Sequence, residues 1–260
     1  MKKNKRWFFF VALVILSASA VGYIVYYSTA LRQNEAIYQQ LQAEIIRPEE
    51  NSREDALEDQ EEQPTLPADI PVDFETLWAI NPDVYAWIEI PGTQVSYPIL
   101  RHPSDDSYYL DHTIEGAEGY PGSLYTQRCD AADFSDFNTV IYGHNMKDGS
   151  MFGSLKDFRD PDFLRAHRDI YIYTPDKILS YQIFAAVVYD DRYIPYCYDD
   201  EIIEDRQAFL DSLSNTRNLN SQVLDDVSVD ENSRILTLST CIGGQPDQRY
   251  LIEAVCVDET

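Results

Sequence analysis

Hydrophobic and polar residues follow three distinct patterns before the middle of the chain. Residues 7–27 carry no charged side chain, and this is about the length that a helix needs to cross a bilayer. In residues 28–47, Leu31, Ile37, Leu41 and Ile45 would lie roughly on one face of a helix, which predicts a further helix here. Residues 44–69 hold ten acidic and two basic side chains together with prolines, which predicts an extended, solvated segment. Residues 28–69 would therefore form a spacer that begins as a helix and continues as this acidic segment.

From residue 70 onward the pattern changes to short segments rich in β-branched and aromatic residues, bounded by Gly, Pro, Asn or Asp. These segments predict eight strands. They span 85–90, 95–100, 123–127, 139–142, 169–174, 178–189, 234–241 and 250–257. Turn residues at 91–92 and 175–176 predict hairpins over 85–100 and 169–189.

Three stretches of this part have helical rather than alternating periodicity. We predict a short helix at 74–80 and a helix in two pieces, broken near Pro161, at 151–167. A third helix is predicted at 199–214, with Asp199 and Asp200 placed to cap it. Many short strands and few helices predict a mainly β fold, a closed antiparallel or mixed barrel.

The charges at the N-terminus give the apolar segment an orientation. Lys and Arg within residues 1–6 predict that this tail stays in the cytoplasm, so that 1–27 form a single-pass membrane anchor and 70–260 form an extracellular domain. A cleaved signal peptide is the alternative, because 18–20 read Ala-Ser-Ala, a small-x-small cleavage pattern. We favour the anchor because the apolar run continues to Tyr26 and Tyr27, which suit the membrane–water boundary.

Composition narrows the function classes. A formal net charge of −25 gives no positive electrostatic potential that would attract nucleic acid, and a content of 44% apolar residues is too high for a disordered tail. The four His and four Cys do not occur at zinc-ligand spacing, and no Gly-rich phosphate loop follows a strand, so neither a metal nor a cofactor is expected. The cysteine spacing is no disulfide framework, so one or more free thiols are predicted.

Three residues near predicted strand ends could carry chemistry together. His144 lies just after one strand, and Cys241 ends another, two residues before Gly243. Arg249 opens the last strand and would return beside the cysteine in a hairpin. A cysteine thiol needs a neighbouring base to become a nucleophile, and a guanidinium stabilises an oxyanion. The competing interpretation is a buried structural cysteine with an unrelated surface His and Arg.

At these residues the chain resembles a known family. YGHNMKDGSMF at 142–152, TLSTC at 237–241 and a downstream Arg before an apolar strand are similar to class B sortases. The resemblance implies an eight-stranded sortase-type β-barrel with N-terminal helices and an inserted helix before the cysteine strand. It implies a cysteine transpeptidase that cuts a C-terminal sorting signal after its threonine. Cys241 would be the nucleophile, His144 the general acid and base, and Arg249 the oxyanion stabiliser and signal clamp.

The resemblance also suggests which residues line the substrate groove, although ordinary packing explains each of them as well. By position relative to the family motifs they are Leu110, Tyr193, Ile194 and Ser239. Two positions depart from the family pattern. Gly243 stands where some members have an acidic residue, and Asp106 stands where we expect an asparagine.

The partners implied are surface proteins with a C-terminal sorting signal and an amine of Gram-positive cell-wall peptidoglycan. Two related activities remain open: a pilin polymerase would use a lysine acceptor, and a sorting-signal peptidase would release a free threonine end. A third alternative is a catalytically silent surface scaffold, for which Cys241→Ala would leave function unchanged. The sequence favours wall anchoring, with the catalytic domain outside the cell membrane.

Overall fold

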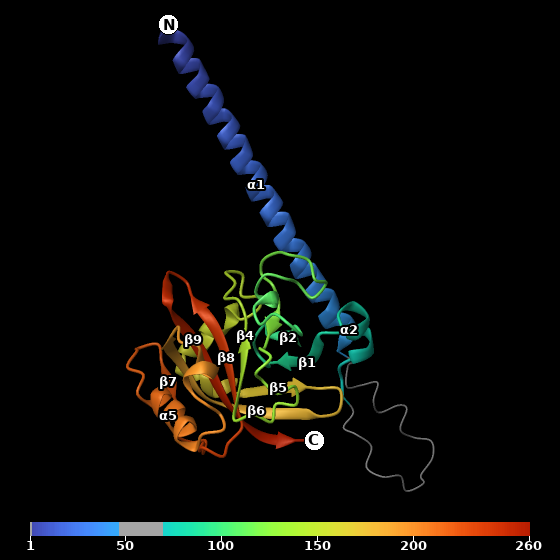
Figure 1. Ribbon diagram of the computed structural model, residues 1–260, viewed down its shortest axis with the longest axis vertical. Helices are drawn as coiled ribbons and strands as arrows, with labels where there is room; N and C mark the ends of the chain where they lie inside the picture. Colours follow the sequence, from blue (N-terminus) through green and yellow to red (C-terminus); the bar gives the residue numbers. More distant parts are fainter. Residues whose placement is uncertain (1, 47–69) are drawn as a thin grey trace. The chain divides into compact units, whose positions relative to one another are not determined.

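A computed structural model describes residues 2–46 and 70–260 of the chain (Figure 1). The chain divides into two compact units, residues 1–40 and 41–260. The predicted acidic spacer lies almost wholly outside the described residues.

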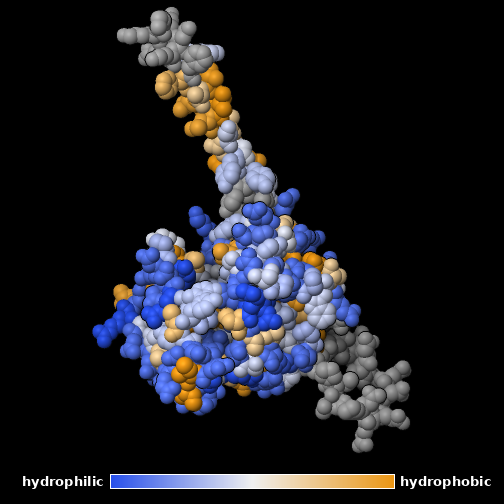
Figure 2. Space-filling view, in the orientation of Figure 1, coloured by the Kyte–Doolittle hydropathy of each residue, from blue (hydrophilic) through white to orange (hydrophobic). Residues whose placement is uncertain are grey.

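The N-terminal part is one continuous helix, α1 (Lys2–Ile45), rather than two separate ones. Within it, Phe9–Tyr26 is long and apolar enough to cross a membrane, by length and composition alone. Apolar side chains of this stretch are exposed, such as Phe9 at 78%, and Figure 2 shows them as an apolar band on the helix. The surface of the larger unit seen in the same view is mostly hydrophilic.

The last residues of α1 belong to the larger unit. Leu41 and Ile45 are buried, and the Gln42 amide donates a hydrogen bond to the Ser96 carbonyl at 2.7 Å. Ile46 forms an antiparallel bridge with Val72. This bridge joins the described residues that flank the acidic segment on either side.

The predicted eight-stranded barrel is confirmed. In spatial order β5, β1, β2, β3, β4, β8, β9 and β6 are hydrogen-bonded neighbours, and a β5–β6 pairing closes the ring. The β2–β3 and β4–β8 pairs are parallel and the others antiparallel. The strands are β1 (Val84–Glu89), β2 (Ser96–Leu100), β3 (Leu124–Tyr125), β4 (Asn138–Tyr142), β5 (Asp169–Tyr173), β6 (Ile178–Asp190), β8 (Ile235–Ile242) and β9 (Gln245–Glu259). A two-residue strand, β7 (Gln222–Val223), pairs with β6 in the antiparallel direction and was not predicted.

The helices match the predictions at two of three places. α2 (Phe74–Ile80) is capped by Asp73, and the 151–167 region forms η4 (Gly153–Arg159) and α3 (Pro161–Ala166), with Asp160 capping the latter. The structure also contains the single-turn elements η3 (Tyr108–Leu110) and α4 (Ile194–Cys197).

The predicted 199–214 helix needs correction at its start, because α5 spans Ile203–Ser214 with Ile202 at the N-cap and no side-chain cap. The two aspartates bond elsewhere. Asp199 accepts from the Glu201 amide, and Asp200 accepts from the Asn138 amide at the start of β4. Asp200 therefore ties the inserted segment to the barrel instead of capping the helix.

Both faces of β8 are buried, and helix α5 packs on the same sheet, most closely on β6. Ile235 of β8 belongs to the apolar cluster that includes residues of α5. Phe209 and Leu213 of α5 join one apolar cluster with Val140 of β4, Val187 of β6 and Leu251 of β9. This packing fixes the strands whose ends carry the candidate residues.

A carboxyl group is fully buried in the same layer. Glu253 of β9 has no solvent exposure, and burial raises its pKa to about 8. The Thr237 hydroxyl oxygen lies 2.8 Å from both Glu253 Oε2 and Asn138 Oδ1. Because the hydroxyl has a single hydrogen, a neutral Glu253 can donate to Thr237 while Thr237 donates to Asn138.

We expect Glu253→Gln to stabilise the protein at alkaline pH. A folded pKa above the unfolded one gives stability that is complete below about pH 4.5 and is lost as the pH rises through about 8. The raised pKa values of Asp130, about 7, and Asp200, about 6, act in the same direction. The neutral amide avoids the loss of stability caused by Glu253, which is on the order of 4 kcal/mol at pH 8.

Thermal unfolding of the two proteins from pH 5 to pH 8 checks this. The melting-temperature gain of Glu253→Gln should grow with pH and nearly vanish at pH 5. Parallel curves across that range would show that Glu253 is ionised in the folded protein.

Candidate active site

The candidate site lies at the shared end of two parallel strands. Tyr142, the last residue of β4, pairs with Ser239 of β8, and the Gly143 amide donates to the Ser239 carbonyl at 3.2 Å. His144 follows Tyr142 by two residues, and Cys241 follows Ser239 by two residues. Adjacent parallel strands in this register carry both residues to the same edge of the barrel.

The third candidate residue joins them across the β8–β9 hairpin. Cys241 and Arg249 are directly opposite each other in the antiparallel register, so their side chains leave the same face of the sheet. Arg249 Nη1 donates to the carbonyl oxygens of Pro246 and Gln248, both at 2.9 Å. Within the described part of the chain Arg249 forms no ion pair, so Asp247 does not neutralise it.

A backbone carbonyl orients His144. Its Nε2 lies 2.8 Å from the Leu110 carbonyl oxygen, and the Tyr120 ring packs at 4.6 Å between ring centroids. A carbonyl oxygen only accepts, so Nε2 carries the hydrogen and Nδ1 is left to exchange a proton. Gly122 holds this loop close, because a Cβ there would approach the Leu110 oxygen to 2.5 Å.

All four cysteines are free thiols, and Cys241 lies at this edge, near the end of β8. Cys241 is exposed and therefore accessible to a substrate. Burial and the charge of Asp130 raise the pKa of Cys129 to about 11, which disfavours its thiolate. Cys241 is consequently the cysteine best placed to act as a nucleophile.

Tyr125 lies near the Cys241 thiol and packs against Tyr142. The rings of Tyr125 and Tyr142 stack at 5.4 Å between centroids. Burial, followed by the negative charges of Cys241 and Asp111, raises the pKa of Tyr125 to about 12. Its phenol therefore stays protonated at neutral pH and is a hydrogen-bond donor rather than a base.

The residues predicted to line the groove divide by exposure. Leu110 and Tyr193 are exposed, at 46% and 37%, and Tyr193 stacks between Tyr142 and Tyr196. Ile194 is buried in the apolar cluster under α5, and Ser239 is buried beside its β4 and β9 neighbours. Leu110 and Tyr193 are thus available to a ligand, whereas Ile194 and Ser239 support the wall behind them.

Sequence reasoning did not single out two polar side chains that connect the strand ends. The Thr240 hydroxyl donates to the Gly143 carbonyl at 2.7 Å, and the Asn145 amide donates to the Cys241 carbonyl at 2.9 Å. Both flank a candidate catalytic residue in the chain. That adjacency was visible in the sequence, but the bonding partners depend on the β4–β8 register.

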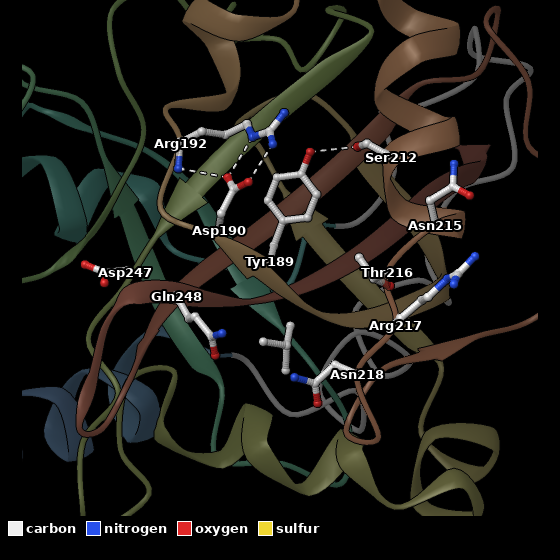
Figure 3. A pocket seen from close by; sticks show the side chains of 11 residues that line it. Tyr189, Asp190, Arg192, Ser212, Asn215, Thr216, Arg217, Asn218, Asp247 and Gln248 are labelled. Atoms are coloured by element: carbon white, nitrogen blue, oxygen red, sulfur yellow. Dashed lines mark hydrogen bonds and ion pairs between the residues drawn. The ribbon is translucent and has the colours of Figure 1, made fainter.

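Residues of β6, β9 and α5 line a polar cavity of about 310 Å³, among them Gln248, the chain neighbour of Arg249 (Figure 3). Tyr189, which pairs with Arg249, donates or accepts a hydrogen bond with Ser212 of α5 at 2.7 Å. Arg192 and Asp190 form an ion pair at its rim. This cavity is lined by none of the three candidate catalytic residues.

Known proteins share sequence with this chain. A family model described as "Sortase domain" matches residues 88–257. Sortase B from Listeria monocytogenes is 36% identical over 169 residues, which cover 65% of this chain and 67% of that protein.

Two solved structures are similar over most of the chain. Sortase B from Bacillus anthracis in complex with AAEK1 has a TM-score of 0.70 and 27% identity, covering 88% of this chain and 98% of that one. A sortase B–substrate complex from Staphylococcus aureus has a TM-score of 0.66 and 26% identity, covering 87% and 97%.

Proposed function

The chain belongs to the sortase family and is a class B cysteine transpeptidase, and on this premise we propose which residues and substrates it uses. It cleaves a C-terminal sorting signal after threonine and transfers the surface protein to an amine of cell-wall peptidoglycan. The observation that carries the proposal is the convergence of Cys241, Arg249 and the His144 loop at one edge of the barrel.

In the first half-reaction the Cys241 thiolate attacks the threonine carbonyl carbon. The tetrahedral oxyanion is stabilised by the Arg249 guanidinium on the same face of the hairpin. Beside the thiolate, His144 carries a proton on both ring nitrogens, and Nδ1 gives its proton, the one that Cys241 has lost, to the leaving amine as the peptide bond breaks. The products are a thioester on Cys241 and the released signal fragment.

The second half-reaction reverses the proton movement. An incoming amine attacks the thioester carbonyl, and His144 Nδ1 takes the proton that the amine loses. Collapse of the intermediate forms the new amide and returns the thiolate. The Leu110 carbonyl keeps Nε2 protonated throughout, so that the same nitrogen, Nδ1, acts in both halves.

The location of the enzyme follows from its N-terminal helix. We propose that Phe9–Tyr26 crosses the cell membrane once, with residues 1–6 in the cytoplasm and the catalytic domain, residues 70–260, outside. Leu110 and Tyr193 contact the sorting signal, while Ile194 and Ser239 shape the groove from behind.

The acceptor test uses the full chain in detergent with threonine-containing sorting peptides and two competing amines. One amine is a glycine or diamino peptide of the peptidoglycan type, and the other is a lysine side chain in a folded protein. We expect the peptidoglycan-type amide to dominate. A dominant lysine adduct would assign pilin polymerisation instead, and free threonine-ended product in excess amine would assign a peptidase.

A further inference from the structure

Side chains continue the β4–β8 ladder after its backbone hydrogen bonds end. The last backbone bond runs from the Gly143 amide to the Ser239 carbonyl. Beyond it, Thr240 binds the Gly143 carbonyl and Asn145 binds the Cys241 carbonyl. His144 lies between the two residues that are bonded in this way, so its backbone is joined to the cysteine strand on both sides.

The Asn145 side chain projects from a closely held loop. Asn145 forms an antiparallel bridge with Met151, and the His144 carbonyl accepts from the Phe152 amide at 3.0 Å. Gly153 permits this closure, because a Cβ there would lie 2.2 Å from the Met146 carbonyl oxygen. The Asn145 side chain that binds the Cys241 carbonyl therefore extends from a backbone that is held in place.

The cysteine strand is less well supported on its far side. The ladder between β8 and β9 is irregular between Cys241 and Ile242, and the chain then turns through Gly243 and Gly244. A Cβ at either glycine would have no neighbour within 4 Å. Because side chains of this turn do little to hold Cys241 in place, a hydrogen bond to the Cys241 carbonyl has a larger influence on the position of this residue.

We infer that Asn145 is a positioning residue, which sets the separation of Cys241 from His144 by binding the Cys241 carbonyl. It touches no reacting atom. Its amide hydrogen bond places the nucleophile's peptide group against the loop that holds the base. This inference rests on the proposed roles of the two catalytic residues.

The decisive comparison is between Asn145→Ala and the nearly isosteric Asn145→Asp in the full chain. If catalysis needs the hydrogen bond that the Asn145 amide donates, both variants lose turnover, because alanine has no donor and a carboxylate cannot donate to a carbonyl at neutral pH. We expect kcat to fall about tenfold in each, since small misplacements of reacting groups carry large rate penalties. KM should be unchanged because the groove is untouched.

Thermal stability distinguishes positioning from folding. The Asn145 bond is near the surface, so water can replace it, and the melting temperature should change little. Asn220→Asp makes the same exchange at an exposed loop position and should keep wild-type kcat. If either Asn145 variant kept kcat within about twofold of wild type, or lost melting temperature and active fraction together, the inference would be wrong.

A readout that needs no peptide substrate separates this inference from the proposed function. Iodoacetamide alkylates thiolates, and peptide mass spectrometry compares Cys241 with Cys197, which is also exposed, in the same molecule. We expect the Cys241-to-Cys197 rate ratio to fall in both Asn145 variants. An unchanged ratio would overturn the inference even if the wild-type protein transfers peptides, and a lowered ratio would support it even if the peptide panel fails.

Discussion

Cys241→Ala is expected to abolish acyl transfer while leaving the barrel folded. Its thiol is exposed at the end of β8 and contributes little burial, so alanine removes the nucleophile without opening a cavity. Removal of a nucleophile that acts together with a neighbouring base lowers kcat by about 10⁴-fold or more. Steady-state transfer of a sorting peptide to an amine measures the effect.

Cys197→Ala is the matched control. It removes another exposed free thiol, at the end of α4, and should retain the wild-type rate. If Cys241→Ala retained its function, the silent-scaffold alternative would replace the enzyme.

His144→Gln is expected to lower kcat by about 10²- to 10⁴-fold, the usual contribution of general acid–base catalysis. Glutamine can keep a donor near the Leu110 carbonyl, so the loop contact is preserved while proton exchange at Nδ1 is lost. KM should change little.

His167→Gln provides the corresponding control. His167 lies at the C-cap of α3, where its ring packs on Phe163, and it is not part of the candidate site. Its substitution should leave kcat unchanged. A His144→Gln enzyme with wild-type kcat would require another base.

The sequence was sufficient to predict the barrel strands and the convergence of His144, Cys241 and Arg249. Alternating residues along 234–241 and the Gly-rich turn after Cys241 encode a hairpin locally, and the structure places Arg249 opposite the cysteine as expected. The family motif gave the roles, which the tests above examine.

Features that depend on distant parts of the chain could not be predicted. Asp200 has the residue type of a helix cap, but it bonds the Asn138 amide on another element. The Leu110 carbonyl that orients His144 is a backbone group, which no residue type indicates. Ile194 was predicted from its position in the family pattern, yet its burial beneath α5 is set by tertiary packing.

The central claim is that Cys241 carries the acyl group between two substrates. Intact-mass measurement of the full chain mixed with a sorting peptide, followed by peptide mapping, tests it most directly. We predict a threonyl adduct on Cys241 that disappears when amine is added and an amide product appears. Amide formation with the adduct on another cysteine, or with no covalent enzyme species at any time, would contradict the claim.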